Sequence, residues 1–263
     1  MITIFFQGHF SSRAQAANYT EGLDIIVDNH VEHVYVPNAP KILYNIFTCK
    51  DLEDVGYGFS WNPLHWFFKL KSMLVNWYCN IHGASWPHSY ITKDNIAGKE
   101  DVDQYIEMIK TCIEQNPDKK IVLFGCSRGA AATLVTVANL SPDLLNHVKL
   151  VIVEAPFDSV ENVLRTSSWC PNVCLFLIKT FTNYKDTQQS PLDAMKTYPN
   201  IPTAFITSNA DTRVPLENTL HLMYELKDYT HIHHLNLESA HHATMFKDPK
   251  YIKFVHDLYQ LYI

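Results

Sequence analysis

The sequence predicts an α/β protein whose mostly parallel sheet lies in the middle of three layers, α/β/α. Short runs of consecutive apolar residues, such as 2–6 and 121–124, are typical of strands that are buried on both faces of a parallel sheet. These runs alternate along the chain with segments of helical periodicity, of which 100–115 is the clearest. With 263 residues, the chain fits one such domain over 1–263, with a large core.

Each expected element follows from its local pattern. The apolar runs predict strands at 2–6, 148–153, 202–207 and 231–237, besides 121–124, and a further strand at 33–36, at 42–47 or at both, of which we favour 42–47 as the core strand. The periodic segments predict helices near 13–27, 100–115, 128–140, 216–227 and 249–262.

Two segments near 60–95 and 160–190 are expected to be helical lid or pocket-wall pieces of the same domain. Aromatic residues crowd the first between Trp61 and Tyr90, and either a helix packed on the sheet or a wall facing substrate explains them. The second is apolar and is interrupted at Pro171.

Composition excludes several classes of protein. The formal net charge is −6 and no basic patch is present, which argues against a nucleic-acid partner. No apolar run is long enough to span a membrane, and the opening residues 1–6 have the pattern of a strand and not of a signal peptide. Six cysteines without an export signal predict free thiols and a cytoplasmic location. Among them, Cys170 and Cys174 are expected to be packing residues.

The clearest motif is Gly125-Cys126-Ser127-Arg128-Gly129, which stands between an apolar strand and an alanine-rich helix. This is the context that a nucleophile elbow requires. A serine raised on such a sharp turn needs neighbours without side chains two positions away, and Gly125 and Gly129 supply them. The helix behind the turn directs N–H groups towards the reacting centre. We therefore expect Ser127 to be a nucleophile.

A serine hydroxyl needs a base, and the base needs an orienting acid. Asp211 follows one expected strand and His241 follows the next, so both lie where open α/β sheets place their sites. Asp211 could instead only cap a helix, and Asp158 is the alternative acid. Because adjacent residues point in different directions, only one of His241 and His242 can serve, and we choose His241.

An oxyanion hole needs two backbone donors. Arg128 supplies one N–H at the start of the helix, and His9, with Phe10 as the alternative, is expected to supply the other from the loop after the first strand. The guanidinium of Arg128 could bind a substrate carboxylate, but a surface ion pair is favoured. No metal is expected: His231 and His233 have the spacing of two ligands and lack a third.

With these residues in place, the chain resembles the α/β-hydrolase superfamily over nearly its whole length. The resemblance rests on Gly8-His9, on the elbow, on the stretch Asp-Thr-Arg-Val-Pro at 211–215 and on Ala240-His241. It is greatest to the branch of dienelactone-hydrolase-like and prolyl-oligopeptidase-like enzymes. It implies a triad of Ser127, Asp211 and His241 and no cofactor. The opening strand matches the one that normally comes third, so the N-terminal strands are expected to be trimmed.

The expected function is that of a serine hydrolase, an esterase, thioesterase or peptidase-like enzyme that forms an acyl-enzyme. Its partner would be a small-molecule or peptide acyl substrate. Two alternatives remain at this point. The same residues would support acyl transfer to an acceptor other than water. A non-catalytic scaffold could instead use the aromatic segment 61–86 to bind a ligand or protein.

Overall fold

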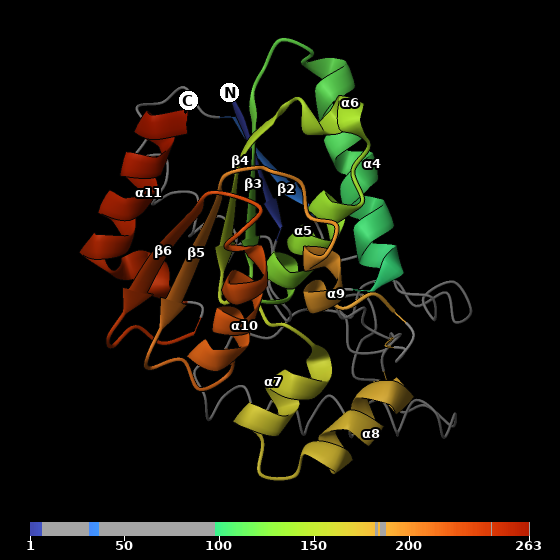
Figure 1. The fold of residues 1–263 in the computed structure, drawn as a ribbon, viewed down its shortest axis with the longest axis vertical. Helices are drawn as coiled ribbons and strands as arrows, with labels where there is room; N and C mark the ends of the chain where they lie inside the picture. The colour runs from blue at the N-terminus through green and yellow to red at the C-terminus, as the bar shows by residue number, and fades with distance from the viewer. Residues whose placement is uncertain (7–31, 37–97, 182–183, 185–187, 243, 263) are drawn as a thin grey trace, which may run out of the picture.

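A computed structural model describes residues 1–6, 32–36, 98–181, 184, 188–242 and 244–262 (Figure 1). The described strands are β1 (Ile2–Phe6), β2 (Glu32–Val36), β3 (Ile121–Cys126), β4 (Val148–Glu154), β5 (Thr203–Ser208) and β6 (Ile232–Leu237). The described helices are α4 (Lys99–Gln115), α5 (Arg128–Ala138), α6 (Pro142–Leu145), α7 (Val160–Ser167), α8 (Pro171–Phe181), α9 (Pro191–Met195), α10 (Leu216–Leu226) and α11 (Pro249–Tyr262), with a 3₁₀ turn, η1, at Met245–Lys247.

The described strands form one parallel sheet in the order β2-β1-β3-β4-β5-β6, which confirms the predicted fold class. From β1 the chain moves outward to β2, whereas from β3 onward it moves towards the opposite edge. The order therefore reverses between β1 and β3. In open α/β sheets a crevice forms outside the carboxyl ends of the strands at such a point, and Ser127 follows β3 there.

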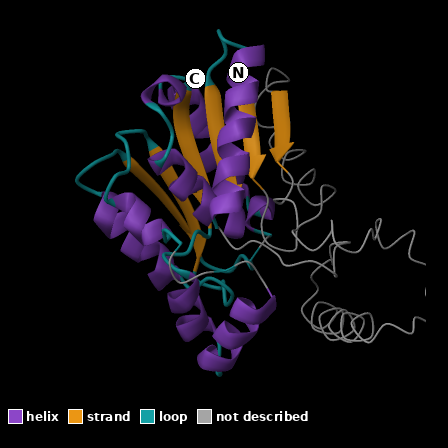
Figure 2. Cartoon of the chain, turned by 90° about the vertical axis from the view of Figure 1, so that its right-hand side faces the viewer, coloured by secondary structure: helices purple, strands orange, loops and turns teal. Residues whose placement is uncertain are grey.

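Strand alternation explains the three layers. Phe6 stacks on Tyr105 of α4, whereas Thr3 bonds to Tyr259 of α11 at 2.8 Å. Residues three apart on a strand point to opposite faces, so α4 and α11 cover opposite faces of the sheet. Gly125 is paired with Phe6 in the sheet, which puts it on the α4 side, where α5 also lies. Figure 2, turned by 90°, shows the strands between helices.

The apolar runs form the core. Strands β1, β3 and β5 are buried at every position, as the pattern of consecutive apolar residues predicts for strands that are covered on both faces. Strand β6 lies at the sheet edge, and its residues are half-buried or exposed except for the buried Leu237.

Beside β1 the sheet contains β2, which corresponds to the 33–36 run. The favoured run 42–47 and the expected helix near 13–27 lie outside the described residues, as does the expected wall segment at 60–95.

The second expected wall segment, 160–190, contains α7 and α8 and ends just before α9. The break falls at 168–170, and Pro171 is the first residue of α8, where its missing N–H costs no helical bond. Figure 1 shows the α7–α8 pair beyond the carboxyl ends of the strands, on the side where the elbow lies. None of the helices in the described part of the chain has the length and apolarity to cross a bilayer.

Candidate active site

Ser127 occupies the sharp turn between β3 and α5 that the motif predicts. Its backbone has φ 53° and ψ −117°, a conformation that residues with a Cβ rarely adopt. Two backbone bonds hold it there: its N–H donates to Glu154 O on β4 at 2.7 Å, and its carbonyl accepts from Ala131 N at 3.0 Å. The turn is thus fixed by the neighbouring strand on one side and by the helix on the other.

Gly125 is required by close packing beneath this turn. A Cβ at this position would lie 2.6 Å from Ala130 Cα and 2.6 Å from Thr133 Oγ1, both on α5. The Ala130 atom belongs to the backbone and cannot move aside easily. Gly125 therefore lets the first turn of α5 lie directly against the end of β3, where it directs the helix start towards Ser127.

Three side chains from distant parts of the chain form a hydrogen-bonded relay at the carboxyl edge of the sheet. Ser127 Oγ lies 3.0 Å from His242 Nε2, and His242 Nδ1 lies 2.6 Å from Asp211 Oδ2. A carboxylate only accepts, so Nδ1–H donates to Asp211, which leaves Nε2 as the acceptor for the serine hydroxyl. The imidazole is mostly buried and the Asp211 carboxylate almost completely so.

Asp211 combines the two roles that its sequence context allowed. Its Oδ1 accepts from the N–H groups of Arg213 and Val214, at 2.8 and 3.0 Å, and so stabilises the turn after β5. Its Oδ2 remains for His242. Because the backbone bonds fix the carboxylate, the imidazole is held by a rigid partner.

The choice of His241 is corrected by this geometry, since the imidazole next to Ser127 belongs to His242. The side chain of His241 is exposed, while its carbonyl accepts from both the N–H and the hydroxyl of Thr244, at 3.1 and 2.9 Å. This local turn fixes the backbone so that His242 points inward and His241 outward. The sequence shows two adjacent histidines, and only the turn decides between them.

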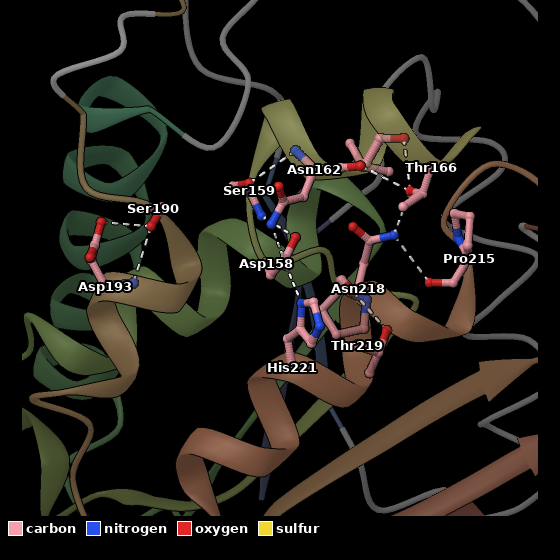
Figure 3. A network of polar contacts seen from close by, with 12 residues as sticks. Asp158, Ser159, Asn162, Thr166, Ser190, Asp193, Pro215, Asn218, Thr219 and His221 are labelled. Carbon is pink, nitrogen blue, oxygen red and sulfur yellow. Dashed lines mark hydrogen bonds and ion pairs between the residues drawn. The ribbon is translucent and has the colours of Figure 1, made fainter. Parts of the chain in front are cut away.

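The alternative acid, Asp158, belongs to a different network, shown in Figure 3. Its carboxylate is buried and contacts the N–H of Ser159 at 2.6 Å, Asn162 Nδ2 at 2.9 Å and His221 Nδ1 at 2.9 Å. These contacts connect the loop after β4 and α7 to α10. Asn218, also on α10, adds a bond to Thr166 of α7 at 2.9 Å. Asp158 thus anchors α7 to the body of the molecule.

Arg128 places its guanidinium in the interior, where it pairs with Asp101 on α4. Its Nη1 lies 3.0 and 2.9 Å from the two carboxylate oxygens, and the side chains are 2% and 0% exposed. The expected ion pair is present, but it is buried and not at the surface. From its position alone, Asp101 is an acidic residue in the first turn of a helix. A buried arginine needs a buried carboxylate, and no sequence pattern identifies which one.

The N–H of Arg128 lies in the first turn of α5, directly after Ser127, at the position where a nucleophile elbow supplies an oxyanion donor. The expected second donor, His9, and its alternative, Phe10, lie outside the described residues. Gly129 is buried within α5.

A second buried carboxyl group supports the elbow from the α11 side. Tyr251 OH donates to Glu154 Oε2 at 3.0 Å, and Cys126 Sγ lies 3.6 Å from Glu154 Oε1. Burial, together with the nearby carboxylate, raises the pKa of Tyr251 well above its ordinary value, so the phenol stays protonated and donates. Glu154 also supplies the carbonyl that holds Ser127, and sequence reasoning did not single it out.

Among the residues that the structure describes, no group of three His, Cys, Asp or Glu side chains is arranged to hold a metal ion. The rings of His231 and His233 lie edge to face, and His233 Nε2 contacts the hydroxyl of Tyr262 at 2.6 Å.

Comparison with solved structures gives the same fold. An acylaminoacyl peptidase of Pyrococcus horikoshii matches 98% of this chain with 13% identity and a TM-score of 0.61, over 36% of its own length. A puromycin-hydrolyzing peptidase of Mycobacterium tuberculosis matches 99%, with 13% identity and a TM-score of 0.61, over 33% of its length. A Pyrococcus furiosus esterase matches 99%, with 13% identity and a TM-score of 0.58, over 82% of its length. The chain thus spans about a third of the two peptidases.

No curated protein matches the chain. The family model of the prolyl oligopeptidase family matches residues 80–260, which include the elbow, Asp211 and His242. This match covers more than half of the 263 residues. The strand–serine–helix turn, the order of the parallel strands and this match agree, and the chain belongs to the prolyl oligopeptidase family of serine hydrolases.

Proposed function

We propose that this chain hydrolyses an ester, thioester or amide bond through an acyl-enzyme formed on Ser127. The observation that carries the proposal is the continuous relay from Ser127 Oγ through His242 to Asp211, with distances of 3.0 and 2.6 Å. A serine hydroxyl becomes a useful nucleophile only when a base can remove its proton during attack. The relay provides this base in the tautomer that attack requires.

In the proposed reaction, Ser127 Oγ attacks the acyl carbon while its proton passes to His242 Nε2. Asp211 Oδ2 stabilises the resulting imidazolium through Nδ1–H and does not itself take the proton. The imidazolium then protonates the leaving alcohol, thiol or amine, which departs and leaves the acyl group on Ser127. Water, deprotonated by the same imidazole, hydrolyses that ester.

The oxyanion that forms in each half-reaction needs donors that are in place beforehand. We assign one to the N–H of Arg128, which the α5 start directs towards Ser127. The second is proposed to come from the backbone of His9 or Phe10. The α7–α8 pair, which lies beyond the carboxyl ends of the strands, is proposed to form one wall of the acyl-binding pocket.

The two adjacent histidines allow a sharp test. Ser127→Ala, His242→Ala and His241→Ala would be compared in hydrolysis of a short p-nitrophenyl ester and in labelling by a fluorophosphonate probe. We expect Ser127→Ala to abolish labelling and His242→Ala to lower turnover by at least about 10⁴-fold, as loss of a triad member does. His241→Ala, a matched change one residue away, is expected to retain turnover within about threefold, since its imidazole is exposed.

Labelling that survives in Ser127→Ala would refute the nucleophile. An inactive His241→Ala beside an active His242→Ala would refute the assignment of the base. Product analysis with added alcohols or amines would show whether water is the acceptor, and acyl transfer that dominates over hydrolysis would overturn the proposed reaction.

A further inference from the structure

Two thiols face each other where the α7–α8 turn enters α8. Cys170 Sγ and Cys174 Sγ are 3.9 Å apart, both thiols are free, and both residues are half-buried. Cys170 stands just before Pro171, and its carbonyl accepts the N–H groups of Val173 and Cys174, each at 3.1 Å. It therefore caps the first turn of α8. Cys174 lies one turn later on the same face, which is why the sulfur atoms meet.

Ser168 holds the pair in this arrangement. Its hydroxyl oxygen accepts the N–H of Cys170 at 3.2 Å and lies 3.2 Å from Cys174 Sγ. One side chain thus connects the backbone of the first cysteine to the sulfur of the second. The turn thus brings the two residues together.

The surroundings differ from those of an inert packing cysteine. Trp169, the residue between Ser168 and Cys170, is 95% exposed, so the turn lies at the surface and a small reagent can reach it. Cys112 and Cys126, by contrast, are buried in the core and in the support of the elbow. The reactivity of a thiol depends on its accessibility as well as on its thiolate character. Among these four thiols, the two at the turn are the accessible ones, so we expect them to react first.

Helix geometry indicates how stable a bond between the two sulfur atoms would be. Residues four apart at a helix start have Cβ atoms about 5–6 Å apart, whereas a disulfide needs about 3.5–4.5 Å. Closure therefore requires Cys170 to move towards the helix by about 1–2 Å, and it can do so because it precedes α8. A disulfide formed under this strain is readily reduced, which is typical of regulatory disulfides and not of structural ones.

We propose that Cys170 and Cys174 form a reversible dithiol–disulfide site that reacts with low-molecular-weight disulfides. The thiolate of one cysteine attacks the small disulfide, which releases one small thiol and leaves a mixed disulfide. The thiolate of the second cysteine then attacks the protein sulfur of that mixed disulfide and releases the second small thiol. The cysteine pair loses two electrons and two protons, and the small disulfide gains them.

This site does not depend on the proposed catalytic reaction. It lies on the α7–α8 pair, so its closure would change the start of α8 beyond the carboxyl edge of the sheet. In the oxidised form Cys174 has no S–H left to donate to the Ser168 hydroxyl, so this contact would change. The site thus connects the oxidation state of the surroundings to the shape of that segment.

Trypsin gives a direct readout, because residues 166–179 lie between Arg165 and the cleavage after Lys179 and contain both cysteines. The folded chain would be equilibrated in mixtures of reduced and oxidised glutathione, and its remaining thiols would be alkylated under denaturing conditions. The masses of its tryptic peptides would then be measured by mass spectrometry. We expect peptide 166–179 to lose two hydrogens, to carry no alkyl group, and to regain both thiols after dithiothreitol. Peptide 111–119, which contains the buried Cys112, is the internal control and is expected to remain alkylated.

The variants Cys170→Ser and Cys174→Ser distinguish a dithiol site from two separate thiols. Each is expected to trap the first step, so that one glutathione accumulates on the remaining cysteine at concentrations where the unaltered chain shows the internal bond. Two outcomes would overturn the proposal: peptide 166–179 carrying two glutathiones in the unaltered chain, or remaining fully reduced where the single variants become glutathionylated. Hydrolysis of the p-nitrophenyl ester plays no part in this readout, so its result stands whether or not Ser127 is the nucleophile.

Discussion

The buried pair of Arg128 and Asp101 makes the strongest prediction for stability. Both side chains are almost completely removed from water, and Arg128 Nη1 contacts both carboxylate oxygens at 2.9–3.0 Å. Asp101→Asn keeps the size of the side chain and removes its charge. Removing one partner of a buried pair leaves a charge without its counter-charge in the interior, which costs about 3–5 kcal/mol. We expect the free energy of unfolding to fall by that amount.

The same helix supplies a matched control. Asp103, two residues along α4, pairs with Lys99 at 2.6 Å, but both side chains are mostly exposed. Pairs of this kind contribute about 0.3–0.5 kcal/mol. Asp103→Asn makes the same chemical change on the same element, so a comparison of the two variants isolates burial.

Urea unfolding followed by circular dichroism measures the difference. We expect the midpoint of Asp101→Asn to fall well below that of Asp103→Asn, with an unchanged dependence on urea concentration in both. Equal losses in the two variants would refute the inference that burial makes the Arg128 pair important. So would an Asp101→Asn variant as stable as the unaltered chain.

Enzyme kinetics distinguish the effect of the Arg128–Asp101 pair on the position of the Arg128 N–H from its effect on the stability of the fold. The pair fixes the first residue of α5, whose N–H is the proposed oxyanion donor, and such donors act mainly in the transition state. In conditions where Asp101→Asn remains folded, we therefore expect kcat to fall while KM changes little. A rise in KM at constant kcat would show that the pair shapes substrate binding instead.

Three further predictions concern single positions. Gly125→Ala places a Cβ 2.6 Å from backbone Ala130 Cα and should displace α5, so we expect little folded protein; a thermal melt close to that of the unaltered chain would contradict this. Asp211→Asn should lower ester turnover about 10⁴-fold with the fold intact, because His242 loses the acceptor that fixes its tautomer. Burial lowers the pKa of His233 below 6.5, so the unfolded chain takes up the proton first and stability falls as the pH drops through about 6.5; His233→Gln should weaken this fall in urea titrations between about pH 8 and pH 5.

The sheet could be predicted from the sequence because its strands are buried on both faces. A run such as 121–124 has no polar residue to expose, so it fits the middle of a parallel sheet and few other places. The elbow could be predicted for a related reason. Only a glycine fits at Gly125, where a Cβ would meet α5, and the motif records that requirement directly.

Side-chain directions in irregular turns could not be predicted. His241 and His242 are identical residues at adjacent positions, and a shift of one residue reverses which of them faces the sheet edge. The bonds from Thr244 to the His241 carbonyl determine the direction, and they depend on a turn that leads into η1. Ion-pair partners that lie far apart in the sequence could not be predicted either. Nothing near Arg128 in the sequence points to Asp101, 27 residues earlier.

The buried carboxyl groups of Asp101 and Glu154 explain how the strained backbone at Ser127 stays in place. A residue with a Cβ at φ 53° costs about 1–3 kcal/mol, and such a turn persists only where its surroundings fix it. On the α4 side, Asp101 holds Arg128, the residue directly after Ser127. On the α11 side, Tyr251 holds Glu154, whose carbonyl accepts the Ser127 N–H. Each face of the sheet thus fixes one side of the turn, and relaxation of Ser127 would require a buried contact to break.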